Sequence, residues 1–591
     1  MTGAQGTSTL AFAGRALASV LVCLVLAGCA TIPNETPVQA VPNAPGAPTQ
    51  TTLPKLGDMD PVSLIRGYLD DNTKPRELHA AARRYLSEPA NSAWRDEAGF
   101  VIINDDFTVL QNEPSPRATP GPSTQSAVTK SLLVRGKKLG RLDLGDHTFV
   151  PEADDFEWPV TVRKQDGMWR IDNPLPGVVV PRGAFGHSYH AIQLFFFDPA
   201  TVDAGQTRAR LVPDRRYLSG DEPSGVPASI VEMLMHGPSA GLADAVRTKI
   251  PAGTRLLRNV VPGPDNVLTV NLAGLGELSK EDRRLLAAQI VLSLESVTKE
   301  RIKVLNQDRP LTNDIAELRP ADFADLSAAK QPSQGLQGYI TVGGTVRSLK
   351  DNAPLAGPPG KPGFGALTAA QAPEGAGIAV TTVGSLRVGT NPIDLQTVPL
   401  AGGPLTLPSW RHGAAEVWTV AGSTVYRVLA GPDGKWAAKP VDATEFTSLG
   451  KITQLRLSRD GVRVAAIVGG FVVVGNIVVT QGSVRIAGVR KLAAGLTGGK
   501  AKAVDWRNPD ELVVGLEATT GSPVVQLSMD GLDCVEFQKA DLTVPIQWVA
   551  SSPDRDYVVV DSSGMWQTKD AKQPWRPFPF SDRAAVPAYP G

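Results

Sequence analysis

The sequence predicts a multidomain protein in which two α+β domains are followed by an all-β propeller of about five blades. At roughly 100 to 200 residues per domain, a chain of 591 residues suggests several folding units. Its 58 glycines and 49 prolines indicate many turns, which β-rich domains need. In the last part of the chain, similar segments recur every 39 to 49 residues, a spacing typical of propeller blades.

Residues 1–28 are predicted to be a secretory signal peptide. Arg15 precedes an apolar run over residues 16–28, and a positive charge, an apolar run and small residues in this order are typical of export signals. The run is shorter than the roughly 20 apolar residues that a membrane-spanning helix needs. We therefore expect the rest of the chain to be exported.

The end of the apolar run resembles the bacterial lipobox, with Leu26, Ala27 and Gly28 as signal-peptidase recognition residues and Cys29 as the cysteine after the cut. The resemblance implies that Cys29 carries lipid such as palmitate, and two acyl chains anchor a protein stably. The chain would then be held on the outer face of the cytoplasmic membrane. The alternative is an ordinary signal peptide, or a signal anchor, with a cysteine there by chance.

The first exported segments are a tether and an α+β domain. Residues 29–56 are rich in proline and, if extended at about 3.1 Å per residue, would reach on the order of 80 Å. Residues 57–187 are predicted to be the α+β N-terminal domain. Its first helix begins with Asp60 as the cap and Pro61 in the first turn. A second helix over His79–Leu86 and several strand-like runs follow.

Residues 188–325 are predicted to be a second α+β domain. A strand over His190–Phe197 precedes a helix that Pro227 opens, and a long helix is expected to begin at Ser279. This order, with a closing strand over Arg301–Leu305, resembles the GerMN domain first recognised in spore germination proteins. The resemblance implies the GerMN fold for this domain.

The rest of the chain divides into a linker and the propeller. Residues 326–362 are rich in Pro, Gly, Ser and Ala and contain a candidate strand over Tyr339–Leu349, which would complete the last blade. Residues 363–591 carry the repeats, each with an apolar strand after a turn. The residues taken as one equivalent position are Gln371, Trp410, Leu457, Trp506 and Ser551. An open β array or a sandwich is the alternative to a closed propeller.

The composition and motifs predict no catalytic residue, no metal site and no cofactor. Lys plus Arg equals Asp plus Glu at 59 each, which argues against a nucleic-acid partner. The 6 histidines lack the spacing of zinc ligands, and the sequence has neither a Walker A loop nor a dinucleotide-binding glycine motif. The segment nearest to a nucleophile elbow, Gly186–His190, lacks the final glycine. We therefore do not expect an enzyme.

One basic stretch is a candidate partner-binding surface. No acidic residue occurs between Asp460 and Asp505, so the positive charges between them have no local counter-charge. Anionic lipid or an acidic partner would fit such a surface. The alternative is an ordinary solvated loop. The candidate residues are Arg485, Arg490, Lys491, Lys500 and Lys502.

The order of lipobox, tether, α+β domain, GerMN-like domain and propeller is similar to that of the LpqB lipoproteins of actinobacteria, over essentially the full chain. The resemblance implies a non-catalytic accessory role through contact with the extracytoplasmic domain of the sensor kinase of the MtrAB two-component system. That system governs cell-wall homeostasis and division. Two alternatives stay open: a cell-wall glycan-binding module, and a propeller enzyme with an unrecognised site.

Overall fold

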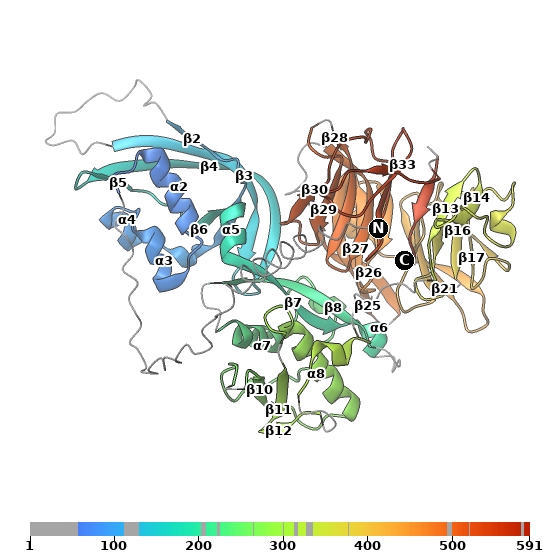
Figure 1. The fold of residues 1–591 in the computed structure, drawn as a ribbon, viewed down its shortest axis with the longest axis horizontal. Helices are drawn as coiled ribbons and strands as arrows, with labels where there is room; N and C mark the ends of the chain where they lie inside the picture. Colours follow the sequence, from blue (N-terminus) through green and yellow to red (C-terminus); the bar gives the residue numbers. More distant parts are fainter. Residues whose placement is uncertain are drawn as a thin grey trace, which may run out of the picture. The chain divides into compact units, whose positions relative to one another are not determined.

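The computed structural model describes residues 57–111, 129–202, 209–220, 225–263, 265–299, 301–312, 317–326, 335–375, 377–480, 482–492, 499–518, 520–580 and 584–591. The predicted signal peptide and tether, with Cys29, lie outside these residues. The described residues form an α+β N-terminal domain, a second α+β domain and a β-propeller, as the sequence predicts (Figure 1). None of the described helices is long and apolar enough to cross a membrane.

The N-terminal domain has a sheet of order β5-β4-β3-β1-β6, with β2 also paired to β3, and α2 lies on this sheet (Figure 1). Asp60 caps α2 as predicted, because its carboxylate accepts hydrogen bonds from Val62 N (2.9 Å) and Ser63 N (3.2 Å). Tyr68 on the buried face of α2 packs against Trp158 of β4. The elements are α2 (Pro61–Asp71), α3 (Arg76–Arg83), α4 (Glu88–Ala93), η1 (Asp96–Ala98), β1 (Phe100–Ile103), β2 (Thr108–Gln111), β3 (Thr129–Asp143), β4 (Thr148–Gln165), β5 (Met168–Ile171) and β6 (Val178–Pro181).

The second domain combines the β7–β8 hairpin with a sheet of order β12-β11-β10-β9. Its long helix α8 begins where predicted, because Ser279 Oγ accepts a hydrogen bond from Asp282 N (3.0 Å). The hydroxyl of Ser293 in α8 accepts a hydrogen bond from Phe195 N of β7 (2.9 Å), which ties the helix to the hairpin. The elements are α5 (Arg182–Ser188), β7 (Tyr189–Phe197), α6 (Pro199–Val202), β8 (Leu211–Ser219), α7 (Val226–His236), η2 (Ala243–Ala245), β9 (Arg255–Leu256), β10 (Leu268–Ala273), α8 (Lys280–Leu294), β11 (Ile302–Asn306), β12 (Arg309–Pro310) and η3 (Pro320–Phe323).

The propeller has five four-stranded sheets and one three-stranded sheet within the described residues. In each four-stranded sheet consecutive strands are neighbours, and the first strands of successive sheets lie side by side around the centre. The elements are β13 (Tyr339–Val342), β14 (Thr345–Ser348), η4 (Pro358–Gly360), β15 (Thr368–Gln371), β16 (Ile378–Thr382), β17 (Ser385–Gly389), β18 (Gln396–Pro399), β19 (Ser409–Trp410), β20 (Glu416–Ala421), β21 (Thr424–Ala430), β22 (Trp436–Val441), α9 (Thr444–Thr447), β23 (Ile452–Leu457), β24 (Arg463–Val468), β25 (Phe471–Thr480), β26 (Ser483–Lys491), β27 (Gly499–Asn508), β28 (Glu511–Ala518), β29 (Val524–Ser528), β30 (Cys534–Glu536), β31 (Trp548–Ala550), β32 (Tyr557–Val560), β33 (Met565–Thr568), β34 (Arg576–Pro577) and β35 (Val586–Ala588).

The prediction of about five blades misses a sixth, which is built from both ends of the propeller segment. Strand β13 pairs antiparallel with β14 on one side and with β35 on the other. The candidate strand at Tyr339–Leu349 therefore does not complete the last four-stranded blade but forms a hairpin in a blade of its own. The repeat pattern does not reveal this blade, because its three strands are not consecutive in the sequence.

The predicted equivalence of the repeats is confirmed, because each position lies within two residues of the end of the first strand of a four-stranded sheet. The two tryptophans at this position have the same role. The indole N–H of Trp410 donates to the Ala370 carbonyl (3.2 Å), and that of Trp506 donates to the Arg456 carbonyl (3.0 Å). Both acceptors lie in the first strand of the preceding sheet, so these hydrogen bonds tie successive blades together near the centre.

The closing blade offers a test of the propeller's stability. Ile340 of β13 is fully buried and packs with Val558 and Val560 of the neighbouring sheet. We expect Ile340→Ala to lower the free energy of unfolding by about 2–5 kcal/mol, because it leaves a cavity in that blade. Urea unfolding followed by tryptophan fluorescence would measure the change.

Val383→Ala is the matched control, because Val383 lies in the same propeller and is 89% exposed. This control should change the free energy of unfolding by no more than about 0.5 kcal/mol. Equal midpoints for the two variants would contradict a stabilising role for β13.

Candidate functional site

The β7–β8 hairpin of the second domain contacts one side of the propeller (Figure 1). Arg463, at the start of β24, donates a hydrogen bond to the Pro213 carbonyl of β8. Arg210, just before β8, donates to the His412 carbonyl in the turn after β19. These contacts join residues that lie 250 and 202 positions apart in the sequence. The hairpin is therefore held by the turns that connect first to second strands of the propeller sheets.

Arg215 of β8 faces three carboxylates of the propeller in this interface. Its Nη1 lies 2.8 Å from Asp510 and its Nε lies 3.6 Å from Asp530, and its Nη2 pairs with Asp533. Tyr217 OH donates a hydrogen bond to Asp530 at 2.7 Å. Burial raises the pKa of Asp510 to about 6, against the lowering effect of Arg215. The interface is thus built on a charge cluster in which Asp510 and Asp530 are buried and Asp533 lies at the exposed edge.

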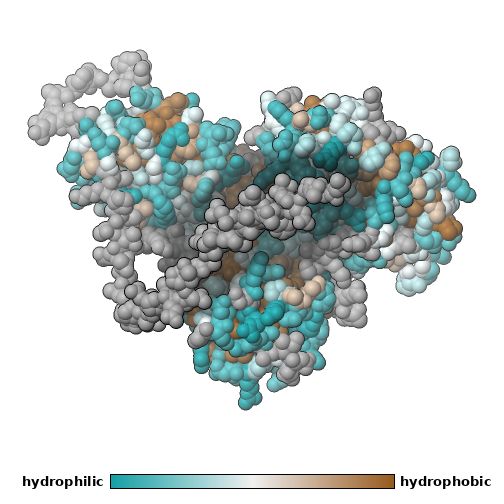
Figure 2. Space-filling model, in the orientation of Figure 1, coloured by the Kyte–Doolittle hydropathy of each residue, from teal (hydrophilic) through white to brown (hydrophobic). Residues whose placement is uncertain are grey.

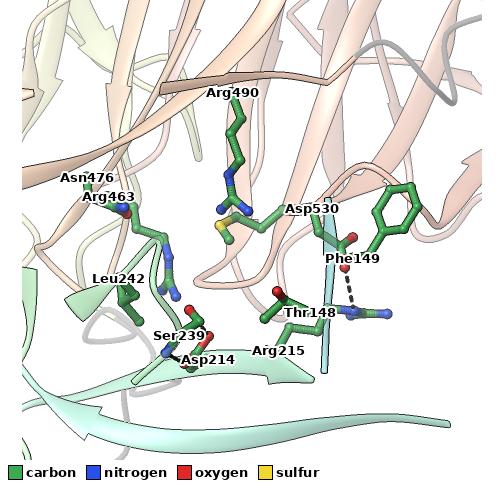
Figure 3. Close-up of a pocket in the computed structure, with 11 residues that line it drawn as sticks. Thr148, Phe149, Asp214, Arg215, Ser239, Leu242, Arg463, Asn476, Arg490 and Asp530 are labelled. Atoms are coloured by element: carbon green, nitrogen blue, oxygen red, sulfur yellow. Dashed lines mark hydrogen bonds and ion pairs between the residues drawn. The ribbon is translucent and has the colours of Figure 1, made fainter. Parts of the chain in front are cut away.

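A small cavity of about 20 Å³ lies beside this cluster and is lined by residues of all three domains (Figure 3). Its volume suits about one water molecule, so this junction cavity is too small for an organic substrate. The guanidinium of Arg490, from β26, points into the junction cavity toward Asp530 (Figure 3). The lining residues are Thr148, Phe149, Asp214, Arg215, Ser239, Leu242, Arg463, Asn476, Arg490, Met529 and Asp530.

The other buried carboxylates at the junction also have structural partners. Asp214 pairs with Arg216 (2.6 Å) and accepts hydrogen bonds from both the N–H and the hydroxyl of Ser239. Asp460 pairs with Arg463. Within the described residues, no group of three or more His, Cys, Asp or Glu could hold a metal ion. The chemistry of this junction is that of an interface that fixes the hairpin to the propeller.

The structure divides the predicted basic stretch into two parts. Arg485 pairs with Asp244 of the second domain (3.0 Å), and Arg490 lines the junction cavity. Arg485 is therefore used in an ion pair within the chain, and Arg490 faces a cavity between the domains. The remaining candidates, Lys491, Lys500 and Lys502, are exposed, and Lys502 pairs with Glu517 of β28 at the surface (2.8 Å).

These lysines lie near apolar side chains that are also exposed. The ammonium of Lys491 is 4.1 Å from the centre of the Phe471 ring, and Phe471 is 45% exposed. The Lys500 side chain lies along Gly470, just before Phe471, and Ala501 N donates to the Gly470 carbonyl (2.8 Å). We term this surface the lysine patch; it comprises Leu449, Lys451, Phe471, Lys491, Lys500 and Lys502.

The lysine patch lies at the end of its sheet opposite the end that contacts the hairpin. The turn over Gly469–Gly470 joins β24 to β25, whereas the turn with Gly461, which lies close to Arg210, joins β23 to β24. Successive turns of an antiparallel sheet alternate between its two ends. The sequence does not reveal the patch, because Leu449 lies before β23, Phe471 begins β25 and Lys500 lies at the start of β27. The one local signal is an aromatic residue directly after a Gly-Gly turn.

Three family models match consecutive parts of the chain. The model described as "Lipoprotein LpqB, N-terminal domain" matches residues 54–186. The model described as "Sporulation and spore germination" matches residues 193–312, and the "Lipoprotein LpqB beta-propeller domain" matches residues 343–590. These matches follow the three domains seen in the structure.

Individual relatives match over nearly the whole length. "Lipoprotein LpqB" of Rhodococcus opacus is 30% identical over 620 aligned positions, which cover 97% of both chains. "Lipoprotein LpqB" of Mycolicibacterium smegmatis is 30% identical and covers 93% of both chains. Among solved structures, Hsv2 of Kluyvelomyces marxianus shares 11% identity, covers 33% of this chain and 75% of its own, and has a TM-score of 0.22.

The Arg215 cluster can be tested by removing its cation. We expect Arg215→Met to lower the free energy of unfolding by about 3–5 kcal/mol, because Asp510 and Asp530 would lose their buried counter-charge. Hydrogen exchange should become faster in β8 and in the turn over residues 529–533. Urea unfolding and exchange mass spectrometry would measure the two effects.

Arg135→Met is the control for this variant. Arg135 and Glu157 form a surface ion pair whose side chains are 55% and 56% exposed, so its loss should cost less than about 1 kcal/mol. An Arg215 variant that behaves like the Arg135 variant would show that the charge cluster does not hold the hairpin.

Proposed function

Because the chain belongs to the LpqB lipoprotein family, we propose that it is an extracytoplasmic lipoprotein held on the cell membrane by lipid on Cys29. In this proposal it is a non-catalytic accessory protein that binds the extracytoplasmic domain of a sensor kinase. The kinase belongs to an MtrAB-like two-component system of cell-wall homeostasis and division, as the family resemblance implies.

Two observations support the membrane anchor. Leu26, Ala27 and Gly28 stand directly before Cys29 in the order of a lipobox, at the end of a short apolar run. The relatives that match over nearly the full chain bear the name lipoprotein. Lipid on Cys29 would keep the three domains close to any membrane-bound partner, since the tether has a limited reach.

The observation that carries the binding role is the lysine patch. The hairpin occupies one side of the propeller, and the patch presents Phe471 and Leu449, 45% and 41% exposed, at the opposite end of the β23–β26 sheet. Exposed apolar groups beside several lysines suit a protein partner with an acidic surface, although Lys502 also pairs with the exposed Glu517 at 2.8 Å. We propose that the kinase domain supplies this surface, and that Lys491, Lys500 and Lys502 steer its approach.

The glycan-binding alternative would be favoured by a groove of exposed tryptophans. All ten tryptophans lie in the described residues, and each is buried or half-buried. The enzyme alternative would be favoured by a buried acidic pair free to act as acid and base. Asp510 and Asp530 both lie near Arg215, which engages them as counter-ion. These observations therefore favour neither the glycan-binding module nor the propeller enzyme.

Binding of the kinase domain is the direct test of the function. The exported chain, residues 30–591, should bind the purified extracytoplasmic domain of the kinase in biolayer interferometry. Charge reversal by Lys491→Glu and Lys500→Glu together should slow association about ten-fold, and the wild-type rate should fall as salt is raised. A wild-type protein with no affinity for the kinase domain would contradict the proposed function.

The control for the lysine patch is Lys435→Glu with Lys439→Glu. Both residues are exposed and lie at or near β22 of another blade, so this variant makes the same charge change in the same domain. It should associate at the wild-type rate. Binding that is slowed equally by both pairs would leave the kinase contact standing but move it away from the patch.

The anchor has a separate test. Cys29→Ser should leave a larger, unprocessed precursor and abolish labelling by a clickable fatty acid, because it removes the lipid attachment residue. Cys23→Ser, within the predicted signal peptide, should be processed and labelled normally. Immunoblotting and in-gel fluorescence would compare the two, and a normally labelled Cys29 variant would refute the anchor.

A further inference from the structure

The turns at one end of the propeller carry no charge over three consecutive sheets. At the end opposite the β7–β8 hairpin, turns join the second to the third strand of each sheet, counted from the centre, and connections lead into the first strands. In the sheets of β13, β16 and β20 these segments hold 26 residues without a single Asp, Glu, Lys or Arg, whereas 20% of the whole chain is charged. We term these segments the uncharged patch; they are residues 342–345, 363–367, 382–385, 400–408 and 421–424.

Two apolar side chains stand out from the uncharged patch. Val383, in the turn between β16 and β17, is 89% exposed, and Leu367, just before β15, is 46% exposed. Leu367 N donates to the Thr381 carbonyl (2.9 Å), so both side chains lie at the same end of one sheet. Ala366 N donates to the Gly344 carbonyl (2.9 Å), which joins this sheet to the β13–β14 turn. Figure 2 shows brown apolar residues on the propeller at the right of the view, where Figure 1 places β13, β14, β16 and β17.

The hairpin end of the propeller has a different composition. The turns between first and second strands there contain Glu374, Arg411, Arg459 and Asp510. Two of these residues, Glu374 and Asp510, pair with arginines of the second domain. Aspartate is common in tight turns, so turn geometry does not exclude charge from the uncharged patch. The lack of charge therefore belongs to one end of the propeller and indicates a partner that disfavours charged groups.

The lysine patch lies at the same end of the propeller, in the neighbouring sheets of β24 and β28. There Lys491 and Lys500 lie beside the exposed Phe471, and Lys502 pairs with Glu517. An apolar, uncharged area beside lysines is typical of surfaces that lie on anionic membranes. Apolar side chains reach below the headgroups, and lysines meet the negative charge of the lipid. A second copy of this end would offer the lysines no acidic surface, so a bilayer fits the two patches better than a dimer does.

From these observations we propose that the end of the propeller opposite the hairpin lies on a bilayer that contains anionic phospholipid, with Val383 and Leu367 inserted below the headgroups. The proposal rests on the proposed export of the chain, but it requires neither lipid on Cys29 nor the kinase. It would give the protein a second membrane contact besides its anchor. This contact would also fix which end of the propeller faces the membrane.

The anchor and the propeller contact are compatible in length. The tether, residues 29–56, could reach on the order of 80 Å when extended. The longest strands of the propeller, such as β25 with 10 residues, span about 33 Å. The tether is therefore long enough to pass the propeller from one end to the other. A kinase domain that emerges from the same membrane would meet the lysine patch from its side.

The test measures binding of the unlipidated exported chain, residues 30–591, to vesicles of phosphatidylglycerol and phosphatidylcholine in equal parts. Flotation over a range of lipid concentrations gives the partition coefficient. Val383→Asp should weaken partitioning at least about ten-fold, because insertion would bury a carboxylate. Ile393→Asp is the matched control, because Ile393 is 64% exposed in the β17–β18 turn, at the hairpin end of the same sheet. This control should partition as the wild type does.

A fluorescent label reports insertion directly. Cys534 is the only cysteine in residues 30–591, so Cys534→Ala gives a background without cysteine. An environment-sensitive nitrobenzoxadiazole label is then attached at Val383→Cys or, as the control, at Ile393→Cys. Vesicles should shift the emission of the label at 383 to shorter wavelength and leave the label at 393 unchanged, because only the first enters an apolar environment. Both sites are exposed, so the melting temperatures of the two variants should agree.

Several results would overturn the proposal. One is a wild type that does not float with vesicles, and another is equal weakening by Val383→Asp and Ile393→Asp. Binding that Lys491→Glu with Lys500→Glu abolishes and Val383→Asp leaves unchanged would replace insertion by a purely electrostatic contact. A dimer that Val383→Asp dissociates, without vesicle binding, would assign the uncharged patch to a second copy. The assay contains neither acylated Cys29 nor the kinase, so failure of the anchor or of the kinase contact would not change its result.

Discussion

The antiparallel pairing of β35 with β13 closes the propeller, and the features described above depend on this closure. Without it, β13 would present an unpaired strand edge. The same closure brings Pro590 and Gly591 beside Arg459 at the centre of the ring. It also holds the inner strands in a circle, so that their turns form a single surface for the β7–β8 hairpin.

The contact between that hairpin and the propeller gains its specificity from charge. Taking Arg215, Asp510 and Asp530 out of water costs free energy, which only closely matched partners offset. A shifted hairpin would leave several charges unpaired in an apolar environment. Arg485 and Asp244 make a similar pair at a more exposed place, where water weakens their attraction. Buried charges therefore select one arrangement, while exposed pairs add little to it.

The helix starts and the repeated blades could be predicted from the sequence, because each depends on interactions that leave a recognisable local pattern. Asp60 and Ser279 cap helices where the sequence places the helix starts, because capping needs only residues a few positions apart. Trp410 and Trp506 mark equivalent blades because each makes the same hydrogen bond to the preceding blade. The sixth blade is not predictable in this way, since its strands lie at residues 339 to 348 and 586 to 588.

The candidate binding residues were harder to predict for the same reason. A run without acidic residues joins Arg485 and Arg490 to three lysines, but Arg485 has its partner 241 positions away at Asp244. Only the folded chain separates charges used within the protein from charges left at the surface.

The position of the closing strand has a consequence for how the protein reaches its folded state. Residue 339 pairs with residue 588, so the ring stays open until almost the entire propeller segment is available. If the chain is exported from its N-terminus, as we propose, the earlier blades would wait outside the cytoplasm with one sheet edge uncovered. During that interval the unpaired β13–β14 hairpin would be the part of the propeller most open to aggregation or to a chaperone.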